Sequence, residues 1–148
     1  MTRLLIYAGP NGSGKSSLRV GTSTDIEPVD VVIDPDQIAR GINPTSPRDA
    51  DREAGRRAIE MFNASLATGK SISLETTLSG HSIIRRITAA RMAGYHVELR
   101  CIALASVEMN VQRVRARAAG GGHFIEPEAI RRRYIGSLVN LPTVIGLS

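Results

Sequence analysis

The sequence predicts an α/β fold in which strands alternate with helices, and three observations carry that prediction. Residues 3–8 form an apolar run that is typical of a buried parallel strand, and this run stops at Gly9-Pro10. A glycine-rich loop follows directly, and we expect a helix from about Lys15. Further strand and helix signals alternate along the chain, which predicts right-handed crossovers and a mostly parallel sheet.

The next elements each have a signal of their own. A short strand at 31–33 ends before Pro35, because proline cannot continue a central strand. A long helix then closes at Gly69, and its apolar side chains recur at helical spacing. The expected buried stripe of this helix comprises Ala58, Met61, Phe62, Ser65 and Leu66.

The second half of the chain repeats the alternation. A strand at 71–75 precedes a helix that ends near Gly94, and a strand at 95–104 follows. The next helix ends at Gly120-Gly121-Gly122, and Pro127 is well placed to begin a last one. The expected buried face of that last helix comprises Ile130, Tyr134, Leu138 and Leu141.

Length and composition limit the classes of protein to consider. The 148 residues fit a single domain over residues 1–148. The single cysteine, Cys101, excludes an internal disulfide and a cysteine-based zinc site. No apolar run approaches the length of a membrane span, so we expect no membrane partner and a cytoplasmic location.

The charge distribution predicts an anionic partner. Lys and Arg number 19 against 14 Asp and Glu, a net charge of +5, and six arginines lie in segment 113–133. Nucleic acid is one candidate, but aromatic residues make up only 3% of the chain and Trp is absent, which leaves few stacking platforms. A phosphorylated small molecule fits at least as well.

The loop after the first strand is the strongest motif. Residues 9–16 match G-x-x-x-x-G-K-[ST], the Walker A pattern, between a predicted strand and a predicted helix. Backbone N–H groups of such a loop surround phosphate oxygens, Lys15 reaches the outer phosphates, and the Ser16 hydroxyl binds the accompanying Mg²⁺. The motif therefore predicts a three-layer P-loop NTPase fold that binds ATP. The expected ATP-binding residues are Gly9, Pro10, Asn11, Gly12, Ser13, Gly14, Lys15, Ser16 and Ser17.

Polar side chains follow the second and third strands, where ligands bind in parallel sheets. Asp36 is our choice for the carboxylate that accepts a proton from an acceptor hydroxyl. Asp34 either serves the metal ion or caps the helix that begins near Pro35. Glu75, with Thr76 and Thr77, is the expected substrate-binding group, although a structural Glu remains an alternative.

The arginine-rich helices on either side of Gly120-Gly121-Gly122 predict a helical lid. Guanidinium groups that close over ATP would stabilise the charge on the transferring phosphoryl group. A solvated basic helix face is the alternative for any single arginine. His123 is at most a lid contact.

These residues together resemble the zeta toxin family of P-loop kinases. The resemblance lies in residues 9–17, Ile33-Asp34-Pro35-Asp36, residues 75–80, residues 113–123, and Asn140-Leu141-Pro142. It implies ATP-dependent, Mg²⁺-dependent phosphorylation of a sugar hydroxyl, as of UDP-N-acetylglucosamine, by a toxin whose partner is an antitoxin protein. The implied roles are a base for Asp36, a substrate contact for Glu75, and phosphate-facing lid positions for Arg117 and Arg133.

Two features depart from that family. Thr76 stands where the zeta toxins usually have Gly after the strand-end Glu, and relatives usually continue into another strand beyond Pro142. The resemblance therefore implies a domain that lacks the usual C-terminal strand. Two other functions remain open from the residues themselves: a nucleic-acid-linked ATPase and an inactive nucleotide-binding module.

Overall fold

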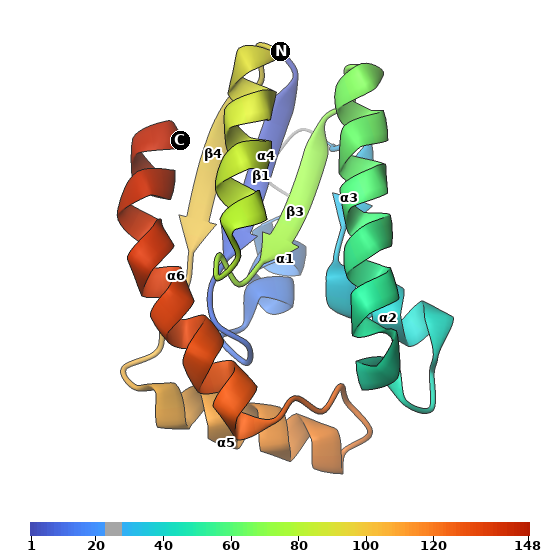
Figure 1. Ribbon diagram of the computed structural model, residues 1–148, viewed down its shortest axis with the longest axis vertical. Helices are drawn as coiled ribbons and strands as arrows, with labels where there is room; N and C mark the ends of the chain where they lie inside the picture. The colour runs from blue at the N-terminus through green and yellow to red at the C-terminus, as the bar shows by residue number, and fades with distance from the viewer. Residues whose placement is uncertain (23–27) are drawn as a thin grey trace.

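The structure is a computed structural model that describes residues 1–22 and 28–148, and these residues contain one parallel sheet (Figure 1). Its strands pair in the order β2-β3-β1-β4 and are β1 (Arg3–Ala8), β2 (Val31–Ile33), β3 (Ile72–Thr76) and β4 (His96–Cys101). The helices are α1 (Lys15–Thr22), α2 (Pro35–Ile42), the short 3₁₀ helix η1 (Pro47–Ala50), α3 (Asp51–Ala67), α4 (His81–Met92), α5 (Val107–Ala119) and α6 (Pro127–Leu147).

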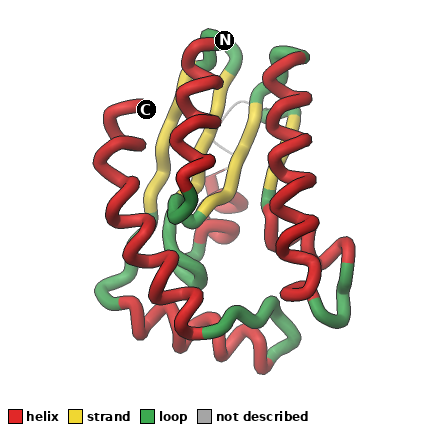
Figure 2. Tube along the Cα trace, in the orientation of Figure 1, coloured by secondary structure: helices red, strands yellow, loops and turns green. Residues whose placement is uncertain are grey.

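The helices flank the sheet on both sides. In Figure 1, α3, α4 and α6 lie in front of the sheet, α1 lies behind it, and α5 crosses beyond the carboxyl ends of the strands. Figure 2 shows the strands side by side, with helices around them. The predicted three-layer, mostly parallel α/β fold is confirmed. No helix of the described residues is long and apolar enough to cross a membrane.

The core lies between the front helices and the central strands. Ile6 of β1 pairs with Leu74 of β3 on one side and with Leu99 of β4 on the other. Phe62 of α3 and Ile87 of α4 pack against these strands and are fully buried. Burial of such side chains is the main source of the stability of the sheet, at roughly 1.5–3 kcal/mol for each one.

Strand β4 is shorter than the sequence predicted. We expected residues 95–104, whereas the strand ends at Cys101, and the next amide, that of Ile102, still donates to the carbonyl of Ala8 at 2.8 Å. The chain then passes over the glycine-rich loop. A side chain on Gly9 would lie 2.3 Å from the Ile102 carbonyl oxygen, so this approach requires glycine at that position.

Helix α6 buries polar side chains where we expected apolar ones. Leu138 was expected on the buried face, but it is 50% exposed, whereas Ser137 and Asn140 are buried. The Asn140 side chain donates to the carbonyl of Leu78 at 2.5 Å and to that of Gly80 at 3.3 Å. These bonds hold the β3–α4 loop, in which Leu78 adopts a left-handed conformation with φ of 60°.

Replacing Asn140 by Ala should therefore destabilise the fold through this loop. The buried carbonyl of Leu78 would lose this donor, which costs about 1–3 kcal/mol, and the carbonyl of exposed Gly80 would lose a weaker bond. Urea denaturation of Asn140→Ala measures the change in the free energy of unfolding. Val139→Ala, at a neighbouring and 70% exposed position of the same helix, is the matched control. Equal stability of the two variants would show that α6 does not anchor the loop.

Candidate active site

A cavity of about 450 Å³ opens at the carboxyl edge of the sheet. The glycine-rich loop contributes Asn11 and Lys15 to its lining, and α6 contributes Arg133. The opposite walls come from the start of α2, the first half of α3 and the β3–α4 loop. The strand-end residues that the sequence singled out, Asp34, Asp36, Glu75, Thr76 and Thr77, all line this one cavity.

The glycine-rich loop holds its shape through close backbone approaches. Gly12 has φ of 76°, and a side chain there would meet the Asn110 carbonyl oxygen at 2.8 Å. The fully buried Asn110 side chain of α5 donates to the carbonyl of Asn11 at 2.9 Å. Helix α5 thus packs against the loop, and the hydrogen bond from the Asn110 side chain fixes the turn that precedes Lys15.

Lys15 folds back over the loop. Its ammonium group donates to the carbonyls of Gly9 at 3.0 Å and Pro10 at 3.2 Å. Burial lowers the pKa of Lys15, and the carboxylates of Asp36 and Glu75 offset part of that effect. Lys15 and Asp36, the two groups to which we assigned the reaction, therefore lie within electrostatic reach of each other.

Glu75 faces the glycine-rich loop. Its carboxylate accepts a hydrogen bond from the Ser16 hydroxyl at 2.9 Å and a second from Arg19 Nε at 2.6 Å. Arg19 also lies 3.8 Å from the carboxylate of Asp34. The expectation of a substrate-binding role did not anticipate these contacts. Through these contacts the Ser16 hydroxyl and the carboxylates of Glu75 and Asp34 lie close together.

This cluster fits a hard cation. Burial raises the pKa of Asp34, and the neighbouring carboxylate of Glu75 raises it further, so the two acids lie close enough for their charges to repel each other. Hydroxyl and carboxylate oxygens are the ligands that Mg²⁺ prefers. Among the described residues no three His, Cys, Asp or Glu side chains form a metal cage, so Mg²⁺ would need phosphate oxygens to complete its shell.

Asp34 also caps α2, which was the alternative that the sequence left open. Its Oδ1 accepts a hydrogen bond from the Gln37 amide at 3.1 Å. The cap and the cluster with Glu75 use the same buried side chain. Capping is thus observed, and metal binding stays a prediction.

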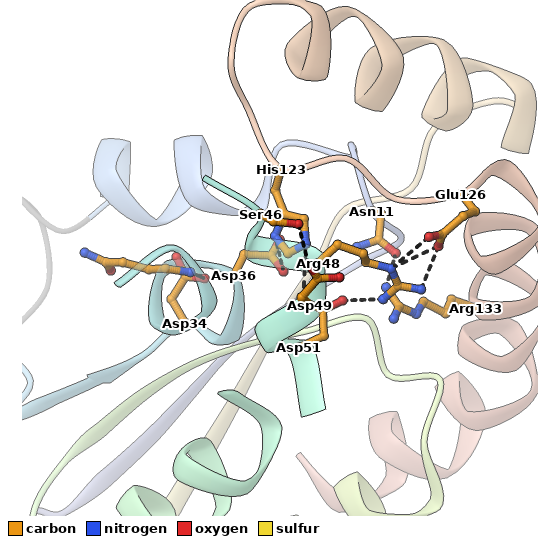
Figure 3. Close-up of polar contacts among 11 residues, drawn as sticks. Asn11, Asp34, Asp36, Ser46, Arg48, Asp49, Asp51, His123, Glu126 and Arg133 are labelled. Atoms are coloured by element: carbon orange, nitrogen blue, oxygen red, sulfur yellow. Dashed lines mark hydrogen bonds and ion pairs between the residues drawn. The ribbon is translucent and has the colours of Figure 1, made fainter. Parts of the chain in front are cut away.

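Asp36 lies beside a buried histidine (Figure 3). The Nδ1 atom of His123 is 3.7 Å from the Asp36 carboxylate, and its Nε2 atom is 3.2 Å from the carboxylate of Asp51. The His123 side chain is only 4% exposed, whereas that of Asp36 is 44% exposed to the cavity and solvent. The segment after Gly120-Gly121-Gly122 thus extends to α2 and α3. It places His123 between the carboxylates of Asp36 and Asp51.

Two arginines link the last helix to the same region (Figure 3). Arg133 donates to the side-chain oxygen of Asn11 at 3.2 Å, and burial lowers the pKa of Arg133. Arg48 of η1 pairs with Asp51 and, at 2.7 Å, with Glu126. Arg48 and Asp51 were not predicted as site residues, because neither belongs to a sequence motif.

The remaining predicted residues differ in their surroundings. Arg117 is exposed on α5. Its positive charge helps to lower the pKa of Lys15, so Arg117 lies near the loop. The Thr76 hydroxyl accepts a hydrogen bond from the Leu78 amide at 3.1 Å, and the Thr77 and Ser79 hydroxyls are 2.8 Å apart. Both threonines therefore shape the β3–α4 loop as well as lining the cavity.

The fold and the loop define a P-loop protein of the kinase-like α/β class. A family model described as zeta toxin matches residues 3–144. The chain belongs to the zeta toxin family. A protein of Haemophilus influenzae described as uncharacterized is 44% identical over 132 residues, which are 89% of this chain and 92% of that protein.

Solved structures share the fold at lower identity. The AvrRxo1-ORF1:-ORF2 complex with ATP matches with a TM-score of 0.75 at 18% identity, over 99% of this chain and 50% of that one. The PezAT toxin-antitoxin system of Streptococcus pneumoniae matches with a TM-score of 0.66 at 17% identity, over 81% of this chain and 54% of that one. The chain thus spans about half the length of these structural relatives.

Replacing Asp34 by Asn should stabilise the protein when no ligand is bound. Asparagine keeps the capping oxygen but removes a buried charge beside Glu75. Because folding raises the pKa of Asp34, the folded state holds more protons than the unfolded state between the ordinary and the raised value. Wild-type stability therefore falls as the pH rises through that window, and the variant should escape this loss.

Urea denaturation from pH 4 to pH 8 tests the point. The advantage of Asp34→Asn should grow with pH, whereas the exposed-site control Asp49→Asn should show no such trend. A variant less stable than wild type at neutral pH would mean that the ion pair with Arg19 outweighs the burial of the charge.

Proposed function

We propose that this protein transfers the γ-phosphoryl group of ATP to a hydroxyl of a small acceptor. The observation that carries the proposal is that Lys15 and Asp36 line the same cavity, with the Walker A loop at one side and open volume at the other. A kinase needs this pairing of a phosphate-binding loop with a carboxylate at the acceptor. A nucleotide sugar, and first UDP-N-acetylglucosamine, is the acceptor we propose to test.

Each residue has a distinct part in this proposal. The loop amides and Lys15 hold the phosphates, and Ser16 and Asp34, with Glu75 beside them, would hold Mg²⁺, which neutralises phosphate charge when bound. Asp36 accepts the proton of the acceptor hydroxyl, and His123 lies where it can orient this carboxylate. Arg133 and Arg117 stabilise charge on the transferring group.

We also propose that the protein acts as a toxin with an antitoxin partner. Its family membership supports this, as does its fold similarity to PezAT, a toxin-antitoxin system. Coexpression with a candidate partner should relieve growth arrest caused by the wild-type chain, and a Lys15→Ala chain should cause no arrest. Arrest that persists in the variant would separate toxicity from phosphoryl transfer.

The direct test incubates the protein with Mg²⁺, radiolabelled ATP and a panel of nucleotide sugars. A labelled acceptor supports the kinase, and the identity of that acceptor defines the substrate. If hydrolysis of ATP appears only with DNA or RNA and weakens steeply with salt, the nucleic-acid-linked ATPase is favoured instead. That second function rests on the exposed arginines of α5, namely Arg113, Arg115 and Arg117.

Replacing Lys15 by Ala should weaken binding of a fluorescent ATP analogue by about tenfold or more and abolish transfer, because a charge-assisted contact to the phosphates is lost. Lys70, the only other lysine, is exposed, so Lys70→Ala is the matched control. Equilibrium titration measures the affinity. Unchanged affinity in Lys15→Ala would contradict nucleotide binding at this loop.

Replacing Asp36 by Asn should leave nucleotide affinity near the wild-type value and reduce transfer by about 10²–10⁴-fold, the usual contribution of a positioned general base. The exposed Asp49 of η1 offers the control Asp49→Asn. Single-turnover transfer with excess enzyme measures the chemical step. If Asp36→Asn transfers phosphate at the wild-type rate, another group is the base.

A further inference from the structure

His123 is a buried side chain whose two ring nitrogens lack a hydrogen bond within the described part of the chain. Buried polar groups are nearly always hydrogen-bonded, so this exception needs an explanation. A carboxylate lies beside each nitrogen: that of Asp51 is 3.2 Å from Nε2, and that of Asp36 is 3.7 Å from Nδ1 (Figure 3). A shift of about 0.5 Å would bring the longer contact within the range of an ordinary N–H···O bond. The ring is thus placed to bridge two acids.

The segment that carries His123 has a fixed backbone. Gly121 has φ of 89°, and the Gly122 amide donates to the Arg117 carbonyl at 2.7 Å. A side chain on Gly122 would lie 2.7 Å from the same carbonyl oxygen, so the turn requires glycine there. Beyond the turn, Ile125 is buried in the small apolar cluster that α5 and α6 share. Helices α5 and α6 therefore set the direction in which the His123 side chain leaves the segment.

Asp51 is the anchored acid of the two. It is the first residue of α3, and Arg48 of η1 pairs with its carboxylate. The same guanidinium pairs at 2.7 Å with Glu126, three residues beyond His123. The Asp51 side chain is 25% exposed, against 44% for that of Asp36. The ion pairs thus fasten the His123 segment to the start of α3, whereas the Asp36 side chain is the more exposed of the two acids.

We propose that Asp51 is a positioning residue that acts through His123. Asp51 holds the imidazole ring, and the ring holds the Asp36 carboxylate toward the acceptor hydroxyl. This inference rests on the proposed function, because it takes Asp36 as the base. It names what fixes the ring, and it makes the position of the base depend on contact between segment 120–126 and α3. A misplacement of about 1 Å in a reacting group can lower a rate about a hundredfold, so this chain of contacts affects transfer.

The experiment measures the transfer step and nucleotide binding separately. Each variant, in excess over radiolabelled ATP, is mixed with Mg²⁺ and UDP-N-acetylglucosamine, and the single-turnover rate of labelling is measured. Titration with a fluorescent ADP analogue gives the nucleotide affinity and the folded fraction. Asp51→Asn and His123→Gln should each lower the transfer rate by about 10–100-fold. Both should keep nucleotide affinity near the wild-type value, because the glycine-rich loop rather than these side chains holds the phosphates.

Two comparisons separate positioning from a merely structural role. His123→Asn places its amide nitrogen near the position of Nδ1 and keeps a donor for Asp36, whereas His123→Gln reaches toward Nε2 and keeps a donor for Asp51. The Asn variant should therefore transfer faster than the Gln variant. The double variant Asp51→Asn/His123→Gln should be no slower than His123→Gln alone, because Asp51 acts through the ring. The exposed residues His96 and Asp49 offer the matched controls His96→Gln and Asp49→Asn, which should react as wild type does.

Three results would overturn the inference: a wild-type transfer rate in Asp51→Asn, losses that multiply in the double variant, or equal rates in His123→Asn and His123→Gln. The proposed function fails separately, if wild type labels no UDP-N-acetylglucosamine. Urea denaturation of the same single and double variants then decides the inference. Independent losses in the free energy of unfolding show that Asp51 and His123 do not interact, which overturns it, whereas coupled losses leave the contact standing without this transfer.

Discussion

The conformation of the loop between β1 and α1 is the constraint on which the site depends. Gly9 and Gly12 adopt positive φ angles, and the Ile102 and Asn110 carbonyl oxygens leave no room for a side chain at either position. The Asn110 side chain adds a buried hydrogen bond to Asn11. Strand β4 and helix α5 thus fix a loop that is far away in sequence, and that rigidity keeps its amides ready for phosphate without reorganisation.

Charges of both signs lie around the loop. Asp34 and Glu75 concentrate negative charge beside Ser16, and Arg133 brings a cation to Asn11. Asp36 lines the same cavity, with His123 3.7 Å from its carboxylate. This arrangement supports the proposed transfer between two bound molecules, because the carboxylate that we propose as the base lines the same cavity as Lys15.

Local sequence patterns predicted most of the fold, whereas contacts between distant segments were beyond them. The apolar run of β1, the Walker A loop and the stripe around Phe62 follow from spacing that can be read within one element. The face of α6 could not be read in this way. Asn140 is buried because its side chain donates to carbonyls of a loop 60 residues away. The spacing of apolar residues within α6 cannot predict such a contact. The role of Arg48 could not be predicted for the same reason, since its partner Glu126 lies 78 residues away.

The central claim is that the loop holds a triphosphate between Lys15 and Asp36. A crystal structure with Mg²⁺ and a non-hydrolysable ATP analogue tests it most directly. We predict that the Lys15 ammonium exchanges the carbonyls of Gly9 and Pro10 for phosphate oxygens, with the terminal phosphate on the side of the cavity that Asp36 lines. An analogue bound elsewhere, with Lys15 still bonded to those two carbonyls, would contradict the account.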